Sequence, residues 1–267
     1  MTVQEFRKAG EELNRMLILR YSPIAFKLIY SEDEIPEGSI RPSQKGGHLA
    51  MCQAFAKVKR ERKAVTMLKE DHWCVWPLVG FRLIDEDEES IQTMGRFLFI
   101  KDKTQSVEFF RNEYPRVDGR RPIGFTLAPL ESTDFEPDIV SIYCSPAQLR
   151  HLLLAVRWIL GEQLELHLDS VDSCVHSTIP VLNGQRFNVT VPDPGEYERA
   201  LCDENEMIFT MRAGEMEELM EGMKFFCTKG IGYRELIMQQ EADHGRPPFY
   251  REMFEKWGLP TGKLWDK

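Results

Sequence analysis

The chain has 267 residues, of which 42% are hydrophobic and 29% charged, a composition typical of an ordinary folded protein rather than a disordered or fibrous one. The formal net charge of −9 argues against a surface that follows phosphates, and so against nucleic acid as the main partner. No apolar run approaches the roughly 18 residues that a membrane span needs, and the charged first segment lacks the apolar centre of a secretory signal. We therefore expect a cytoplasmic protein with no membrane partner.

Helices are predicted where apolar residues recur every three or four positions. The predicted helices cover residues 3–19, 48–62, 105–112, 146–161, 171–182 and 214–226. One more helix is expected after the proline-rich turn at 191–195. The helix over 146–161 is apolar on nearly all sides, which predicts that it is buried. The methionine-rich stripe of the helix over 214–226 is likewise expected to lie in the core.

Strands are predicted where apolar residues alternate or form short runs between turn signals. The predicted strands cover residues 24–30, 64–68, 123–130, 139–144, 164–168, 186–191 and 207–211. Residues 31–47, 71–77 and 85–89 are predicted to be loops or turns. Helices and strands are interleaved without a regular βαβ rhythm. The sequence therefore predicts one α+β domain over residues 1–267, in which helices are mixed with short strands.

Several common chemistries lack the residue spacing that they need. The sequence has no glycine-rich turn followed by Lys-Ser or Lys-Thr to bind phosphates, and no GxGxxG between a strand and a helix. It also has no GxSxG nucleophile elbow and no HExxH or CxxC metal motif. Any site must therefore be assembled from distant parts of the chain.

The chain contains six cysteines, and a reducing cytosol would keep them as thiols. They are Cys52, Cys74, Cys144, Cys174, Cys202 and Cys227. Taken one at a time, each is best interpreted as a small buried apolar residue. The functional question is whether some of them form a set.

Several segments together resemble one known family. They are SPIAFKL at 22–28, MCQA at 51–54, APLE at 128–131, EPDIVSIYCSPAQ at 136–148, and the run from 174 to 207. The chain resembles domain of unknown function 169, a family of bacterial and archaeal cytosolic proteins that mostly have no assigned reaction. The resemblance spans nearly the whole chain and implies a single domain.

The resemblance also implies a set of three cysteines. In the family pattern, one cysteine follows the loop after the first strand, a second lies about twenty residues on, and a third precedes an Asn-Val strand; Cys52, Cys74 and Cys174 occupy these places here. The chain departs from the pattern after that strand, where Gly195 and Arg199 stand in place of a Gly-x-Arg.

Three thiolates from separate elements suit an iron–sulfur cluster with one iron left open to a small molecule, and zinc is the lesser alternative. Such a site would carry redox or Lewis-acid (lyase-type) chemistry. The basic residues Arg60, Arg62 and Lys63 follow Cys52 and would keep thiolates deprotonated if they pointed inward. Trp73 and Trp76 flank Cys74 and would shield a cluster from water.

Three further residues are candidates for catalysis. His72 and His176 each lie two residues from a candidate cysteine, so either would complete a metal shell or donate a proton. Lys27, on the polar side of the first predicted strand, would bind an anionic substrate. The plainer interpretation of each is a satisfied histidine or a solubilising lysine.

The alternative function is a small-molecule-binding protein without metal, in which Trp73, Trp76 and Phe81 line an apolar pocket and the cysteines are structural. A pure interaction protein is not favoured, because the sequence has no heptad repeat, polybasic tract or low-complexity arm. A homo-oligomer is compatible with the same composition. The two main hypotheses are a cluster-binding protein and a metal-free binding protein. They differ in whether Cys52, Cys74 and Cys174 act together as ligands or contribute separately to stability.

Overall fold

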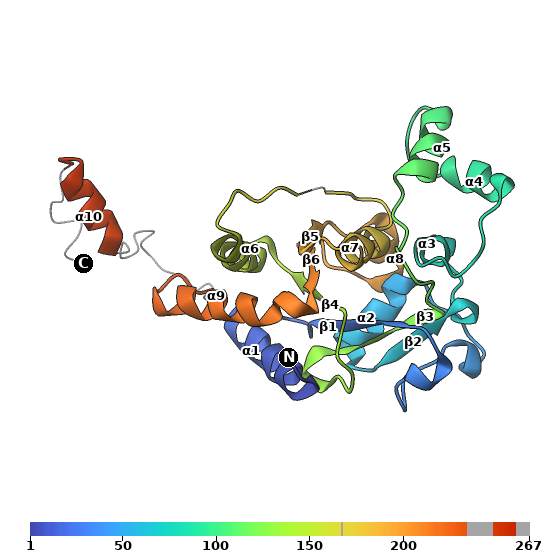
Figure 1. Cartoon of the computed structure of the whole chain (residues 1–267), viewed down its shortest axis with the longest axis horizontal. Coiled ribbons are helices and arrows are strands. Elements are labelled where there is room, and N and C mark those ends of the chain that lie inside the picture. The colour runs from blue at the N-terminus through green and yellow to red at the C-terminus, as the bar shows by residue number, and fades with distance from the viewer. Residues whose placement is uncertain (167, 234–247, 260–267) are drawn as a thin grey trace.

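Six strands form one antiparallel sheet in the computed structural model, which describes residues 1–166, 168–233 and 248–259 (Figure 1). The strands are β1 (Ile24–Ile29), β2 (Val65–Leu68), β3 (Gly124–Pro129), β4 (Ile139–Cys144), β5 (Phe187–Thr190) and β6 (Met207–Arg212). Their order across the sheet is β2-β3-β1-β4-β6-β5, and every neighbouring pair is antiparallel. The predicted α+β class is confirmed.

Helices are interleaved with the strands along the chain. They are α1 (Val3–Leu17), α2 (Met51–Glu61), α3 (Val75–Gly80), α4 (Glu88–Gly95), α5 (Lys103–Asn112), α6 (Pro146–Leu160), α7 (Ser173–Leu182), α8 (Pro194–Ala200), α9 (Met216–Thr228) and α10 (Pro248–Lys256). Figure 1 shows α4 and α5 projecting beyond the end of the sheet that carries β2 and β3. None of the described helices is long and apolar enough to cross a membrane.

The helix boundaries follow local signals in the sequence. α1 begins with a capping box, in which the Thr2 hydroxyl accepts the Glu5 N–H and the Glu5 carboxylate accepts the Thr2 N–H at 2.6 Å. α6 begins with Ser145 as its cap and Pro146 in its first turn, and it ends at Gly161 in the left-handed conformation (φ 68°). These signals explain why both helices were predicted to within two residues.

The sheet separates two hydrophobic clusters because side chains alternate between its faces. On β1, Phe26 packs with α2, α3 and α7, whereas Ala25 packs with α1, α6 and α9. The ring of Phe26 stacks on Phe125 with centroids 5.0 Å apart, and Phe81 packs on Phe125 at 4.8 Å. Phe81 is therefore part of the core and does not line the cavity that contains Trp73 and Trp76, contrary to the apolar-pocket hypothesis.

Three predicted features of the chain were wrong. The strand over 164–168 does not form, since residues 164–166 and 168 have no regular structure; residue 167 lies outside the described residues. Apolar and polar residues alternate over so few positions in loops as well as in strands, so the pattern alone did not discriminate. Residues 75–77, expected to be loop, begin α3, and the acidic turn at 85–89 contains the start of α4, capped by Asp87.

The helix α6 is not buried on all sides, contrary to the prediction. One side packs on the sheet and on α9, where Leu152 and Ala155 are fully buried. Its other side carries Arg150 and Arg157 and leaves Trp158 40% exposed, with the indole stacked on Phe225 of α9 at 5.5 Å. By contrast, the methionines of α9 lie in the core as predicted.

Candidate functional site

Cys52, Cys74 and Cys174 line one cavity of about 400 Å³, although they come from distant parts of the chain. Each stands at the start of a helix. Cys52 is the second residue of α2, Cys174 is the second residue of α7, and Cys74 is the residue that precedes α3. The fold therefore brings together the three cysteines that the family resemblance singled out.

The helix starts converge on the cavity because one carboxylate joins two of them. Asp193, which precedes α8, accepts the Ser173 N–H at 2.7 Å and the Ser173 hydroxyl at 2.9 Å, and thereby caps α7. Its other oxygen accepts the Glu196 N–H at 2.9 Å and caps α8. The Gln53 side chain accepts the Ala50 N–H at 2.9 Å at the start of α2. The positive ends of these helices favour negative charge in the cavity.

Burial keeps the three thiols protonated when they are free. It raises the pKa of Cys52 to about 12 and the pKa of Cys74 to about 11, and it raises the pKa of Cys174 well above its usual value. A charge on Cys52 or Cys74 raises the pKa of Cys174 further, so the three sulfur atoms lie within electrostatic range of one another.

One cation at the cavity lowers the pKa of two of the thiols, against the effect of burial. Arg199 of α8 lowers the pKa of Cys52 and of Cys74, although less than burial raises it. Its guanidinium lies over the Trp73 ring, 5.1 Å from the centroid, and both residues line the cavity. Arg199 thus supplies the positive charge that the sequence analysis sought in Arg60, Arg62 and Lys63.

The basic residues that follow Cys52 do not line the cavity. Arg60 donates to the carbonyl of Leu201, Arg62 pairs with Glu131 at 3.6 Å, and Lys63 pairs with Glu61 at 3.2 Å. The reason is geometric, because they stand at or just beyond the C-terminal end of α2, about two to three turns from Cys52.

The cavity also contains carboxyl groups that the sequence analysis did not single out: Asp172, Asp193 and Glu198. Burial, and then the charge of Asp193, raises the pKa of Asp172 to about 8, and its carboxyl accepts the Tyr114 hydroxyl at 3.3 Å. A signal for Asp193 was present, since Asp followed by Pro and Gly is typical of a helix start. The sequence marked Arg199 only as a departure from the family pattern, and its place at the cavity depends on its contact with Trp73.

The two candidate histidines lie outside the cavity lining. His72 is 7% exposed and meets the Phe125 ring edge-on at 5.5 Å; burial lowers its pKa to about 4. Neither of its ring nitrogens has a hydrogen-bond partner among the described residues. His176 lies 3.7 Å from Asp169 and meets the Tyr114 ring edge-on at 5.7 Å. A catalytic role for either residue stays a prediction.

Lys27 stands in the middle of β1, opposite Thr126 of β3, and does not line the cavity either. It is half-buried and within electrostatic range of Asp138, whose pKa it lowers against the larger effect of burial. Asp138 also accepts the Leu28 N–H at 2.7 Å. The structure therefore does not bring Lys27 together with the three cysteines.

The side chains at the cavity bear on which cofactor would fit. No three His, Cys, Asp or Glu side chains within residues 1–166, 168–233 and 248–259 are arranged to hold a single metal ion. An iron–sulfur cluster places its thiolate ligands further apart than one zinc ion does, because each sulfur binds a different iron. Thiolates are soft ligands that suit both zinc and iron–sulfur clusters, so Cys52, Cys74 and Cys174 are the residues that would hold either group.

The fold and the site define an α+β protein with a cysteine-lined cavity between helix starts on one face of an antiparallel sheet. The chain belongs to the DUF169 family (uncharacterised ArCR, COG2043), whose model matches residues 12–222. This finding confirms the resemblance noted from the sequence segments.

A distant archaeal relative covers most of the chain. The uncharacterized protein MJ0308 of Methanocaldococcus jannaschii is 22% identical over 233 residues, which are 85% of this chain and 97% of the relative. No solved structure matches this chain.

Proposed function

We propose that this protein binds an iron–sulfur cluster through Cys52, Cys74 and Cys174, and that it acts on or senses a small molecule at the iron that these ligands leave open. The observation that carries the proposal is the meeting of the three cysteines, from three separate helix starts, in one cavity of about 400 Å³. A bound cluster would supply redox or Lewis-acid (lyase-type) chemistry.

The surroundings of the thiols support this proposal on electrostatic grounds. Three thiolates carry negative charge, and the starts of α2 and α7 direct N–H groups and positive dipole ends toward the cavity. Arg199 adds a full positive charge next to Cys52 and Cys74. Because the free thiols are protonated, loading the cluster releases protons and becomes more favourable as the pH rises.

The proposal places the protein in the cytoplasm, where thiols stay reduced. All six cysteines are free, which is compatible with that setting. Trp73 and Trp76 line the cavity beside Cys74 and would limit the access of water to a cluster. The partners proposed are a small molecule and an electron donor where the chemistry is reductive; nucleic acid and membranes are not among them.

A second candidate function is a metal-free protein that binds a small molecule in the same cavity. The observation that favours it is the burial of the thiols, which keeps them protonated and leaves them suited to packing. The cavity walls carry apolar side chains, among them Val75, Trp76 and Val171. In this function the cysteines are structural and each contributes separately to stability.

Anaerobic purification followed by a visible spectrum and by iron, zinc and acid-labile sulfide analysis discriminates between the two functions. A broad band at roughly 400 nm with matched iron and sulfide is expected for thiolate-bound clusters. Each of the serine variants of Cys52, Cys74 and Cys174 is expected to lose the whole signal, because a cluster held by three ligands is lost as a unit.

The matched controls are Cys144→Ser and Cys227→Ser, since Cys144 lies in the core on the other face of the sheet and Cys227 is exposed. Both are expected to keep the band. A protein that stays colourless and metal-free after anaerobic reconstitution would refute the cluster and support the second function.

A further inference from the structure

The guanidinium of Arg199 is held in a fixed position at the mouth of the cavity, although the residue is exposed. On one side it lies over the Trp73 ring, 5.1 Å from the centroid. On the other side it packs on Gly195, where an added Cβ atom would overlap the guanidinium. A guanidinium confined between a ring and a backbone loses less conformational entropy on binding than a free one does.

The ring beneath the guanidinium is itself held in place. The Trp73 indole N–H donates to the Gln53 side-chain oxygen at 3.0 Å, and the same oxygen accepts the Ala50 N–H at the start of α2. Trp73 therefore keeps its orientation through a hydrogen bond to the helix that carries Cys52. This arrangement is preorganised for a ligand rather than formed by the ligand.

Arg199 has no partner for its hydrogen-bond donors in the described part of the chain. It makes no ion pair and no hydrogen bond there, whereas neighbouring Arg60 donates to a carbonyl. Both oxygens of the nearby Asp193 carboxylate already accept hydrogen bonds. One accepts the Ser173 N–H and hydroxyl, and the other accepts the Glu196 N–H. A fixed guanidinium with unused donors is the usual receptor for a planar carboxylate, which it binds through two parallel hydrogen bonds.

The walls next to Arg199 are apolar and exposed. Trp73 is 47% exposed, Val75 is 46% exposed, and Phe99 is 81% exposed in the left-handed conformation (φ 58°). All three line the cavity together with Arg199. A ligand that covered these side chains would gain the free energy of removing their apolar surface from water.

We infer that Arg199, fixed between Trp73 and Gly195, is the anchor for the carboxylate of a small organic acid whose apolar body lies against Val75 and Phe99. The inference names a ligand class for the proposed function. It rests on that function only in assuming that a small molecule binds in this cavity. The acid sits at the mouth of the cavity, so the anchor does not require the cluster. Glu198 and Asp193, which line the same cavity, oppose the acid by repulsion and limit its affinity.

The test is calorimetric titration of the full chain with benzoate, in cluster-free protein and in protein reconstituted anaerobically. Saturable binding to one site is expected in both. Arg199→Lys keeps the charge but loses the planar pair of donors, and it is expected to weaken benzoate binding by about tenfold or more. Gly195→Ala keeps the charge and the donors but places a Cβ atom against both the guanidinium and the Asp193 carboxylate, so weaker benzoate binding is expected together with a loss of stability.

Two further variants act as controls. Glu198→Gln removes a repulsive carboxylate and is expected to tighten binding. Arg157→Lys changes an exposed arginine on the opposite face of the sheet and is expected to leave binding unchanged. Thermal unfolding of each variant verifies that it is folded, and Arg199→Lys suffices should Gly195→Ala fail to fold.

The inference is overturned by the absence of saturable benzoate binding, or by equal affinity in the wild type and in Arg199→Lys. Tighter binding of phenyl phosphate than of benzoate would also overturn the carboxylate as the ligand class. The two proposals fail separately: a colourless protein that binds benzoate refutes the cluster alone, and a cluster-loaded protein that ignores benzoate refutes the carboxylate anchor alone.

Discussion

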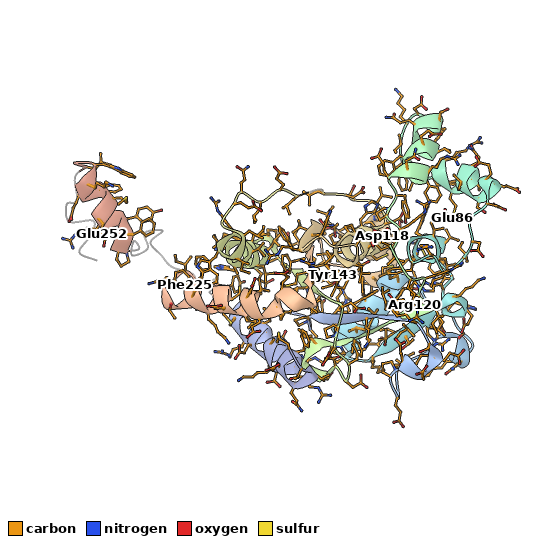
Figure 2. All side chains as sticks on the ribbon, in the orientation of Figure 1. Glu86, Asp118, Arg120, Tyr143, Phe225 and Glu252 are labelled. Carbon is orange, nitrogen blue, oxygen red and sulfur yellow. The ribbon has the colours of Figure 1, made fainter. Side chains whose placement is uncertain are left out.

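The amino group of Lys59 lies 3.0 Å from the carboxylate of Glu206, and the two side chains are only 1% and 9% exposed. The Lys59 ammonium also lies over the Tyr143 ring, 3.5 Å from its centroid. Figure 2 labels Tyr143 near the middle of the molecule. Glu206 accepts two further hydrogen bonds, from the Cys202 thiol at 2.7 Å and from the Asp203 N–H at 3.1 Å. The ion pair thus fastens α2 to the segment between α8 and β6.

Lys59→Met is expected to destabilise the protein by about 3 to 5 kcal/mol, because it leaves the buried carboxylate of Glu206 without its cation. The double variant Lys59→Met, Glu206→Leu removes both charges and is expected to lose less than the single variant. Urea unfolding of the wild type, of the single variants Lys59→Met and Glu206→Leu, and of the double variant measures the coupling between the two sites. Strictly additive losses would show that the two charges do not stabilise one another.

Asp193→Ala is expected to cost about 2 kcal/mol or more, because it removes the acceptor that caps two helices, α7 and α8. The matched control is Asp87→Ala, which removes the cap of α4 alone; there the carboxylate accepts the Ser90 N–H at 2.8 Å. That change is expected to cost about 1 kcal/mol. Equal losses in the two variants, measured by urea unfolding, would contradict the double role of Asp193.

Glu196 gives the protein a pH-dependent stability of predictable sign. Burial raises the pKa of this fully buried carboxyl to about 7, and its Oε2 atom has no hydrogen-bond partner among the described residues. Between its unfolded pKa of 4.5 and its folded pKa of about 7, the folded state holds the proton more strongly. The stability that this group contributes is therefore complete below pH 4.5 and is lost as the pH rises through 7.

Glu196→Gln removes this titration while keeping a neutral side chain of the same shape. Relative to the variant, the wild type is expected to lose at most about 3 kcal/mol of unfolding free energy between pH 4.5 and pH 7.5. Urea unfolding at several pH values measures the difference. A difference between the two proteins that did not change with pH would contradict the raised pKa.

Thiol reactivity distinguishes the exposed cysteine from the buried ones. In cluster-free native protein at neutral pH, Cys227 is expected to react first with an aromatic disulfide reagent, because it is exposed while burial raises the pKa of the cavity thiols. Cys227→Ser is expected to remove the fast phase, and all six thiols react after unfolding. A fast phase that persisted in Cys227→Ser would show that another thiol is ionised or accessible.

Much of the fold was predictable because the chain carries consistent local signals. The strand β4 was predicted with both ends correct, since its apolar run is bounded by Asp138 and by the Ser145 and Pro146 that start α6. The strand predicted over 164–168 alternates leucine with charged or polar residues, and its described residues 164–166 and 168 have no partner in the sheet. Strand formation depends on such pairing, which a single sequence does not display.

The candidate site was predictable only in part. The family resemblance indicated the three cysteines, and the structure brings them together at one cavity. The sequence did not show that His72 and Lys27 lie outside the cavity. His72 is close to Cys74 in the sequence, but its ring packs on Phe125, and Lys27 lies in the middle of β1. The departure from the family pattern pointed to Arg199 but not to its role, because its guanidinium lies against Trp73, which is 126 residues away in the sequence.

The cavity is built from Phe99 and from segments on both sides of the chain's midpoint, at 50–52, 73–76, 171–174 and 193–199. During synthesis, the site is therefore incomplete until the ribosome has passed Arg199 and the later helices have docked on the sheet. A nascent chain or a C-terminal truncation ending before α7 keeps Cys52 and Cys74 but lacks the third thiol and the guanidinium. Any ligand that binds there binds only the finished fold, and it raises the free energy of unfolding in proportion to the logarithm of its concentration. Occupancy of this cavity is thus a measure of completed folding.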